Sequence, residues 1–287
     1  MAKVFPERFP VTDDKSGRRS PGLYISDFLK HQLDIAKRAL KKDWDMVFVI
    51  DGPEGSGKST LAIQVGYYLD PTLIIDRITF TPNEFHDAVI KAKKYECIIF
   101  DEAFGGLSSR RAMSGVNHML ISMLAEIRQK NLVIILVLPS FFDLDRFAAL
   151  HRTRCLLHVY SQKFKRGAFK FYDYNKKKKL YLIGKKTYNY AVVKSNFLGR
   201  FTAFMPIDKE AYRAKKLKSL EDRQDTGEKE RMERGDIRLK YERIKIMERL
   251  SRRGVDNKTI AEVLDVSDST IKRYREHLKS AAMRSDI

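Results

Sequence analysis

The hydrophobic pattern divides the first 160 residues into short apolar runs that alternate with amphipathic segments. The apolar runs lie at 46–50, 97–100, 132–138 and 154–160, and each has the length of one buried strand. Helical spacing of apolar residues marks the segments at 24–42, 82–94, 115–130 and 144–150. Alternating strands and helices predict an α/β fold with a mainly parallel sheet, right-handed crossovers and ligands at the carboxyl ends of the strands.

Two local signals refine this pattern in residues 73–84, before the run at 97–100. Residues 73–75 and 78–80 suggest a strand that bends at Asp76 and Arg77. Thr81 followed by Glu84 three residues later predicts the start of a helix, with Thr81 as its cap.

The pattern changes beyond residue 160. Residues 161–200 contain twelve Lys or Arg and one acid, Asp173, with nine aromatic residues between them. Alternation at 167–174 and 179–183 predicts a basic hairpin whose turn is 175–178. Aromatic rings between cations suit single strands or a phosphate backbone, and an ordinary hairpin with a solvated loop is the alternative. The candidate DNA contacts here are Lys176, Lys177, Lys178 and Lys179.

The run at 46–50 leads into a glycine-rich loop. Gly52, Gly57, Lys58 and Ser59 fit the P-loop pattern G-x-x-x-x-G-K-[ST] at every fixed position. Glycines let successive N–H groups converge on phosphate oxygens at the positive end of the following helix. Lys58 would reach the β- and γ-phosphates, and the Ser59 hydroxyl would coordinate Mg²⁺. A turn without function is the alternative, but the strand before and the helix after favour phosphate binding. ATP and Mg²⁺ are the predicted cofactors, held by Gly52, Pro53, Glu54, Gly55, Ser56, Gly57, Lys58, Ser59 and Thr60.

Two carboxylates, Asp101 and Glu102, close the run at 97–100. Asp101 would hold the water shell of Mg²⁺. Glu102 points to the other side of the strand end, where it would activate a water as the general base. Capping of the next turn is the alternative for the pair. Because no acceptor site or lid of a kinase is evident, the adjacent glutamate favours a Mg²⁺-dependent ATP hydrolase.

The charge of the chain adds a partner to this picture. The 56 Lys and Arg against 37 Asp and Glu leave a net charge of +19, which favours nucleic acid, with an anionic membrane surface as the competitor. Cys97 and Cys155 lie in apolar runs and are predicted to be buried in a reducing compartment. The polar start has no secretory signal, and the longest aliphatic run is too short to span a bilayer. We therefore expect a soluble cytoplasmic protein.

Residues 257–274 have the spacing of a helix-turn-helix. Ile260 and Leu264 face inward from the first helix, Ser267 caps the second, and Ile271 packs back. With a supporting helix from residue 244, the region at 241–278 resembles the trihelical modules of response regulators and resolvases; a protein-interaction module is the alternative. The candidate DNA contacts are Ser269, Thr270, Lys272, Arg273 and Arg275.

The P-loop, the intervening strand, the Asp-Glu pair and Ser140 after the next run resemble the additional-strand, catalytic-glutamate division of P-loop ATPases. Within that division, residues 45–161 are similar to the zonular-occludens-toxin-like and FtsK/HerA-type DNA-pumping ATPases of viruses and mobile elements. The resemblance implies that Ser140 is a polar sensor and that Lys58, Ser59, Asp101 and Glu102 act as described above. It also implies a homo-oligomer, with a hexameric ring as one form, in which an arginine of a neighbouring subunit completes the site. The candidate arginines, each of which could equally form a structural salt bridge, are Arg128, Arg146, Arg152 and Arg154.

Five parts are expected along the chain. They are an N-terminal arm and helix (1–44), the P-loop ATPase core (45–160), a basic aromatic β-rich extension (161–207), a charged helical linker (208–238) and a helix-turn-helix domain (239–287). The expected function is ATP hydrolysis coupled to DNA binding or translocation, in viral packaging, replication or mobile-element maintenance. The alternatives are a nucleotide-switched DNA-binding regulator or loader with slow hydrolysis, and a small-molecule kinase fused to a repressor.

Overall fold

The computed structural model of the chain describes residues 23–101, 122–123, 127–162, 165–222, 245–251, 253–264, 266–267 and 269–274. The chain divides into two units, residues 1–219 and residues 220–287. The predicted loop of phosphate-binding residues belongs to the first unit, and the predicted helix-turn-helix belongs to the second.

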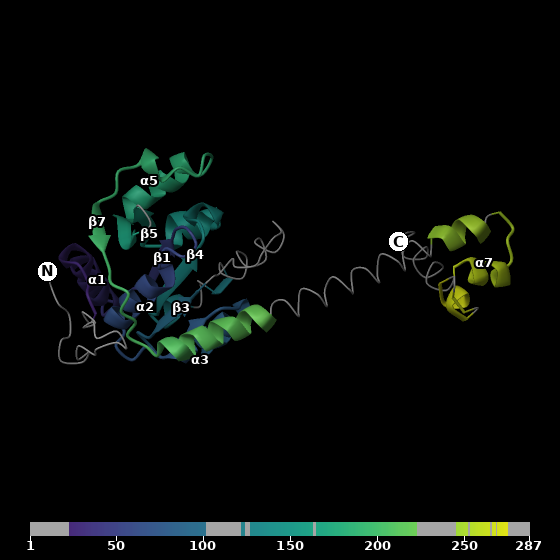
Figure 1. Cartoon of the computed structure of the whole chain (residues 1–287), viewed down its shortest axis with the longest axis horizontal. Helices are drawn as coiled ribbons and strands as arrows, with labels where there is room; N and C mark the ends of the chain where they lie inside the picture. The colour runs from purple at the N-terminus through teal and green to yellow at the C-terminus, as the bar shows by residue number, and fades with distance from the viewer. Residues whose placement is uncertain are drawn as a thin grey trace. The chain divides into compact units, whose positions relative to one another are not determined.

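One mixed sheet forms the centre of the first unit (Figure 1). Its strands run in the order β2-β3-β4-β1-β5-β6-β7. The first five in chain order pair in parallel, and β6 and β7 are antiparallel. Strand β4 therefore separates β1 from β3. The strand bounds are β1 Met46–Asp51, β2 Ile78–Thr79, β3 Cys97–Phe100, β4 Val133–Leu138, β5 Cys155–Gln162, β6 Lys165–Tyr172 and β7 Phe197–Arg200.

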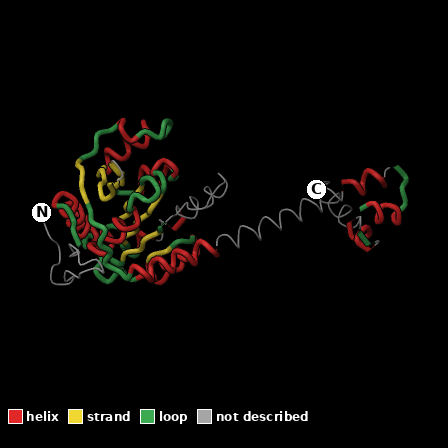
Figure 2. Tube along the Cα trace, in the orientation of Figure 1, coloured by secondary structure: helices red, strands yellow, loops and turns green. Residues whose placement is uncertain are grey.

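Helices and short helical turns connect these strands (Figure 2). The described α-helices of the first unit include α1 Asp27–Leu40, α2 Lys58–Leu69, α3 Pro82–Lys91, α5 Tyr174–Gly184 and a helix over 209–222 that continues past the boundary at 219. The shorter turns are η1 Ile75–Arg77, η2 Phe141–Asp143, η3 Ala148–Arg152, which is a π-helix, and η4 Tyr190–Val192.

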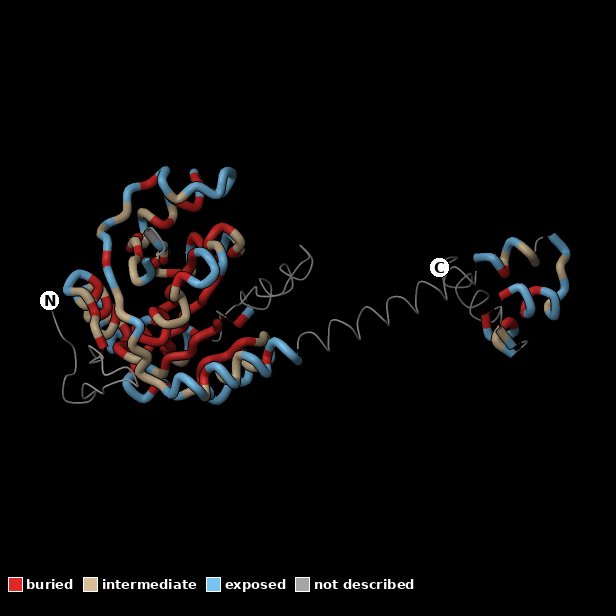
Figure 3. Tube along the Cα trace, in the orientation of Figure 1, coloured by how far each residue is buried: buried red, intermediate tan, exposed pale blue. Residues whose placement is uncertain are grey.

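Both faces of the sheet are buried, as the alternation of side chains along β1 shows. Phe48 and Ile50 enter a core that includes α1 and α2, whereas Val47 and Val49 enter a core that includes α3 and α5. Figure 3 shows the buried segments gathered in the central strands and on the inner sides of the helices. This two-sided burial explains why the strands read as continuous apolar runs rather than as alternating patterns.

Most local predictions for the core are confirmed. The runs at 46–50, 97–100, 132–138 and 154–160 are strands β1, β3, β4 and β5. The Thr81 hydroxyl accepts a hydrogen bond from Glu84 N at 3.2 Å, and the Glu84 carboxylate accepts one from Phe80 N at 2.8 Å. Both cysteines are buried and form no disulfide.

Two predicted elements are shorter than expected. The bent strand at 73–80 keeps only two strand residues, because η1 turns the chain so that the Arg77 guanidinium can pair with Asp70 at 2.5 Å. The helix predicted at 144–150 is replaced mainly by the π-helical turn η3.

The predicted hairpin beyond residue 166 is wrong in its second half. The observed hairpin pairs β5 with β6, and residues 174–184 form α5 instead of a turn and a strand. The Asp173 carboxylate caps α5 by accepting from Lys176 N at 2.8 Å. The buried residues Lys177, Leu180, Tyr181 and Gly184 share one helical face. Residues 161–207, expected as a basic aromatic β-rich extension, thus add β6 and β7 to the sheet and α5 to the helices that pack on it.

Among the described residues from 245 to 274, the second unit has three helical segments around one small core. They are residues 245–251, α7 Asn257–Val263 and residues 269–274. Asp256 caps α7 by accepting from Lys258 N and Thr259 N. The buried residues of this core are Met247, Ile260, Ala261, Leu264, Ile271 and Tyr274. The inward positions predicted from the spacing, Ile260, Leu264 and Ile271, are among these buried residues.

None of the helices in the described part of the chain has both the length and the apolar character that crossing a membrane requires.

Lys177 gives a pH-dependent test of the fold. Its side chain is fully buried, and its ammonium donates to the carbonyls of Ala149 and Leu150. Burial lowers the pKa of Lys177 from 10.5 to about 7. Between these two pH values the unfolded chain binds more protons at this residue than the folded chain, so the free energy of unfolding should rise with pH across that window.

We expect Lys177→Met to lose this rise, because it removes the titrating group while keeping most of the side-chain volume. Urea unfolding of both proteins should give a difference in free energy that is constant below about pH 7 and favours the wild type increasingly above it. Lys179→Met, at an exposed position of the same helix, is the control and should follow the wild type. Parallel pH profiles of wild type and Lys177→Met would contradict the burial of a titrating ammonium.

Candidate functional site

The glycine-rich loop leaves the carboxyl end of β1 and turns into α2. Gly52, Gly55 and Gly57 have φ angles of 138°, 69° and 99°, which side chains rarely allow. A Cβ on Gly52 would lie 2.0 Å from the carbonyl oxygen of Val159, so only glycine fits where the loop crosses β5. Gly57 is the N-cap of α2, and its carbonyl accepts from Leu61 N at 3.1 Å. The loop thus curls at the positive end of a helix.

Lys58 and two serines complete this loop. The Lys58 ammonium donates to the carbonyls of Gly52 and Pro53, both at 2.8 Å, so it lies over the loop. The buried Ser56 hydroxyl donates to the Pro53 carbonyl at 2.7 Å. The tip at 53–55 is exposed, whereas Lys58, Ser59 and Thr60 are half-buried. Backbone N–H groups, an ammonium and a hydroxyl therefore meet at one exposed turn, a combination that suits phosphate.

Asp101 follows β3 at the same edge of the sheet. Its backbone N–H donates to Thr79 O at 2.8 Å, and the residue is 1% exposed. Its Oδ2 accepts from the Tyr212 hydroxyl at 2.5 Å. Its Oδ1 is buried and has no hydrogen-bond partner in the described part of the chain. A buried carboxylate oxygen without a partner is costly unless a cation or water occupies the place beside it.

The residues at this edge fit Mg²⁺ bound together with phosphate. The Ser59 hydroxyl and the unpartnered Asp101 oxygen are the hard oxygen donors that Mg²⁺ prefers. Because Mg²⁺ keeps several waters and shares phosphate oxygens, two protein donors are sufficient. Within the described ranges there is no group of three or more His, Cys, Asp or Glu, so no centre built from protein ligands alone is present in them.

Asp51, the last residue of β1, anchors the start of the loop. It is fully buried, and its Oδ2 accepts from Phe141 N at 2.8 Å and from the Tyr190 hydroxyl. Its Oδ1 lies 2.9 Å from His158 Nδ1, and the His158 ring stacks on Tyr190 with 3.9 Å between centroids. Burial, with the nearby Asp51 carboxylate, raises the pKa of Tyr190, so this hydroxyl keeps its proton to donate. Sequence reasoning singled out none of these residues; a polar residue closing an apolar run was the one available signal.

Ser140 lies beside this network. Its Oγ accepts from Phe142 N at 3.2 Å and lies 3.3 Å from the Tyr190 hydroxyl. Since β4 pairs with β1 so that Leu138 faces Asp51, Ser140 belongs to the edge that carries the loop. The role of Ser140 as a polar sensor stays a prediction.

Arg166 and Phe201 are residues near the loop that sequence reasoning missed. The Arg166 guanidinium lies 3.7 Å from the position that a Cβ on Gly55 would take. The Phe201 ring lies 3.2 Å from the corresponding position on Gly57. Phe201 is held in place by its own N–H, which donates to Gly167 O at 2.9 Å. Only the antiparallel return of β6 and β7 brings these residues to the loop, so no local spacing could have indicated them.

Three of the four arginines proposed to complete a neighbouring site, Arg128, Arg152 and Arg154, lie near the opposite edge. Arg152 pairs with Asp45 at 2.8 Å, just before the amino end of β1. Arg154 covers the ring of Trp44 at 4.6 Å, and Arg128 is exposed before β4. None of these three contacts the chain's own loop in the described residues, and a role in a neighbouring subunit stays a prediction.

The predicted DNA contacts differ in exposure between the two units. In the second unit, Ser269, Lys272 and Arg273 are exposed on one helix, Thr270 is half-buried, and the Ser267 hydroxyl accepts from Thr270 N at 3.4 Å.

The four lysines of the first unit do not form the solvated loop that was predicted. Lys177 is buried, so a phosphate contact from it is ruled out as long as α5 is folded. Lys176 donates to Ser195 O at 3.3 Å, and Lys178 lies 4.7 Å above the Tyr174 ring. Lys179 is exposed. The predicted solvated loop was wrong because the segment is a helix with one face in the core, and DNA contacts from Lys176, Lys178 and Lys179 stay predictions.

Glu102 and Arg275 lie outside the described residues, as do residues 103–121 and the arginines among them. The assignment of Glu102 as the base and of Arg275 as a DNA contact therefore stays a prediction.

The first unit has an α/β fold consistent with a P-loop nucleotide-binding protein. Among solved structures, the crystal structure of the N-terminal domain of zonular occludens toxin from Neisseria meningitidis is similar to this chain. The two are 15% identical with a TM-score of 0.35, over 59% of this chain and 98% of that chain. No protein-family model matches the chain, and no curated protein matches it in sequence. A similarity of this size says nothing of activity, and the chemistry of the site follows from its own residues.

The position of Arg166 generates a prediction for this site. If the loop binds phosphate, Arg166→Ala should weaken the binding of a fluorescent ATP analogue by about 10-fold, because the guanidinium near Gly55 could no longer form a charge-assisted hydrogen bond with it. Lys165→Ala is the matched control, since it removes a charge from the neighbouring exposed residue, whose side chain points to the other face of β6. Equal effects of the two variants in an equilibrium binding titration would mean that Arg166 acts through net charge alone.

Proposed function

We propose that the chain is a Mg²⁺-dependent ATPase that couples ATP hydrolysis to DNA binding or translocation. One observation supports this most directly. A loop with glycines at three left-handed positions leaves β1 beside a half-buried lysine. At the same edge, the buried carboxylate of Asp101 follows β3 and has one oxygen without a partner among the described residues. Phosphate binding explains the loop, and a cation explains the carboxylate.

The strand order supports the proposed division of ATPases. Strand β4 lies between β1, which carries the loop, and β3, which carries Asp101. This is the additional strand that gives the division its name. In the order β2-β3-β4-β1-β5, Ser140 follows the strand between those that precede the loop and Asp101, and this position supports a role as a polar sensor.

In this proposal each residue of the edge has one task. The loop N–H groups and the Lys58 ammonium bind and orient the phosphates, and Ser59 and Asp101 hold the ion. When bound, Mg²⁺ neutralises charge on the phosphate oxygens. Glu102 orients a water and accepts its proton. Arg166 contributes a cation from the chain itself at the tip of the loop.

The DNA part of the proposal rests on charge and on the second unit. The net charge is +19, and the helix at 269–274 exposes Lys272 and Arg273 while Ile271 and Tyr274 enter the core. A short helix held by two others and exposing cations suits a recognition helix of a helix-turn-helix. We include in the proposal a homo-oligomer, with a hexameric ring as one form; sedimentation with and without ATP tests it.

A nucleotide-switched DNA-binding regulator is the second candidate. The hydrogen bond from Tyr212 to Asp101 favours it, because it ties a proposed ion ligand to a helix that runs into the second unit. A motor should show steady ATP turnover stimulated by DNA. A switch should hydrolyse slowly and change its oligomeric state with the bound nucleotide.

The division of roles at the site predicts that two variants fail differently. Lys58→Ala should abolish turnover and weaken ATP binding, because it removes the ammonium that neutralises phosphate charge. Glu102→Gln should bind ATP like the wild type and stop at the ATP state, since only water activation is removed. Binding titrations and single-turnover hydrolysis separate the two. Hydrolysis by Glu102→Gln at the wild-type rate would show that Glu102 is not the base, and equally weakened binding in both would contradict the division.

A second prediction tests the DNA surface. The double variant Lys272→Ala/Arg273→Ala should lower DNA affinity and reduce the slope of log affinity against log salt by about 0.9 for each phosphate that the chain no longer neutralises. Lys179→Ala/Lys186→Ala removes the same charge from exposed positions of the first unit and is the control. Truncation after Arg234 should remove sequence discrimination, measured with specific and scrambled duplexes. If the control pair lowers affinity and the Lys272/Arg273 pair does not, the DNA surface lies in the first unit.

A further inference from the structure

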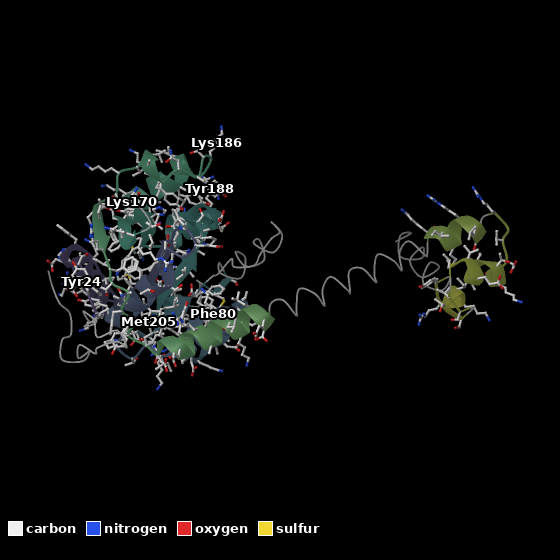
Figure 4. The ribbon with its side chains drawn as sticks, viewed as in Figure 1. Tyr24, Phe80, Lys170, Lys186, Tyr188 and Met205 are labelled. Atoms are coloured by element: carbon white, nitrogen blue, oxygen red, sulfur yellow. The ribbon has the colours of Figure 1, made fainter. Side chains whose placement is uncertain are left out.

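Tyr212 contacts Asp101 across 111 residues of chain. Its hydroxyl donates to Asp101 Oδ2 at 2.5 Å, and both residues are buried, Tyr212 with 6% and Asp101 with 1% of its surface exposed. The Tyr212 ring packs against Phe80, which Figure 4 labels, with 5.7 Å between ring centroids. Tyr212 lies in the first turn of the helix over 209–222, where its N–H donates to Asp208 O at 3.1 Å. The hydrogen bond is therefore made in a packed, water-poor place.

Two other buried carboxylates of the first unit, Asp51 and Asp70, show what a purely structural role requires. Asp51 has partners on both oxygens, as described above. Asp70 Oδ1 accepts from Thr72 N at 2.9 Å, and its Oδ2 accepts from Cys97 N at 2.8 Å and from Arg77. Asp101 differs, because one oxygen is engaged and the other, also buried, has no partner among the described residues. A carboxylate that served only packing would be expected to have both oxygens satisfied.

We propose that Tyr212 is a positioning residue for Asp101. Ion binding at the proposed nucleotide site then depends on whether the segment 201–215, which carries Tyr212, is attached to the rest of the first unit. The inference rests on the proposed function and extends it to regulation of the same site. A donor on Oδ2 holds the carboxylate in one orientation and reserves Oδ1 for the water shell of the ion. Partners of this kind, one step outside the ion, set the geometry and basicity of a ligand.

Hydrogen bonds attach the segment 201–215 to the rest of the first unit at two further points. The Gln64 side-chain amide, in α2, donates to Thr202 O at 2.8 Å and to Phe204 O at 2.6 Å. The Lys215 ammonium donates to Ile75 O at 3.1 Å and to Ile78 O at 2.7 Å. The segment is thus tied to the helix that follows the P-loop, to the start of β2 and to Asp101.

This attachment links the site to the chain beyond it. The helix that carries Tyr212 and Lys215 continues to residue 222, past the boundary between the two units at 219. A displacement of this helix would withdraw the Tyr212 donor from Asp101 without moving the P-loop. Removal of the donor should lower the affinity for the ion and leave phosphate contacts in place.

The test uses Tyr212→Phe in the full chain and measures ion binding directly. Electron paramagnetic resonance of Mn²⁺, with a non-hydrolysable ATP analogue present, should show about 10-fold weaker Mn²⁺ binding, a typical effect for a partner of an ion ligand. Binding of the same analogue in the presence of EDTA should be unchanged. Tyr181→Phe is the matched control: its buried hydroxyl donates to Leu144 O at 2.8 Å, so the variant lacks a buried hydrogen bond away from Asp101. Equal Mn²⁺ affinities of Tyr212→Phe and Tyr181→Phe would overturn the positioning role.

A second variant tests the seating of the segment and covers the case in which Tyr212→Phe does not fold. Lys215→Met contacts no proposed ligand, yet it should also weaken Mn²⁺ binding, because it loosens the helix that carries Tyr212. Combined with Tyr212→Phe it should add little, since both act through one hydrogen bond. Unchanged Mn²⁺ affinity in Lys215→Met, or full additivity in the double variant, would overturn the role of the segment. A wild-type chain that binds neither the analogue nor Mn²⁺ would instead contradict the proposed function.

Discussion

The buried carboxylate of Asp51 holds the functional edge of the sheet together. It ends β1, precedes the first glycine of the P-loop, and joins three segments distant in sequence through Phe141 N, the Tyr190 hydroxyl and His158. An uncompensated buried carboxylate would cost several kcal/mol, so these partners are required wherever Asp51 is buried. Because the turn after β4, β5 and η4 all supply a partner, the loop can leave the strand in one direction only. The geometry of the glycine loop therefore depends on the residue just before the P-loop motif.

The edge that Asp51 organises is closed by segments from later in the chain. Phe201 packs against Gly57, the Arg166 guanidinium lies near Gly55, and Tyr212 donates to Asp101. In a doubly covered parallel sheet the carboxyl ends of the strands are the natural place for a ligand. Here residues of β6 and of the segment 201–215 lie at this edge as well. A nucleotide held by the loop would thus be close to residues that lie outside the P-loop motif, such as Arg166 and Phe201.

Several of the positively charged side chains are buried or paired within the fold, so the net charge of the chain overstates the charge that is exposed. Lys177 and Lys215 direct their ammonium groups to backbone carbonyls, and burial lowers the pKa of each. Lys58 bonds to the carbonyls of its own loop, and Arg152 pairs with Asp45. These cations serve the fold or the nucleotide site rather than a nucleic-acid surface. The net charge supports a polyanionic partner, but the contact residues have to be sought among exposed cations such as Lys272 and Arg273.

Local patterns in the sequence were sufficient for the alternation of strands and helices, the glycine loop, the Thr81 cap and the inward positions of the three-helix unit. Each depends on residues a few positions apart, where backbone geometry links spacing directly to structure. The same reasoning failed at 174–184, where an alternating basic segment became a helix because Asp173 caps it and one face meets the core. Only the tertiary structure decided the strand order and the contacts of Asp51 with His158 and Tyr190 and of Asp101 with Tyr212. These partners lie 107, 139 and 111 residues apart, and they meet because of strand register and the return of the chain, which periodicity along the sequence does not encode.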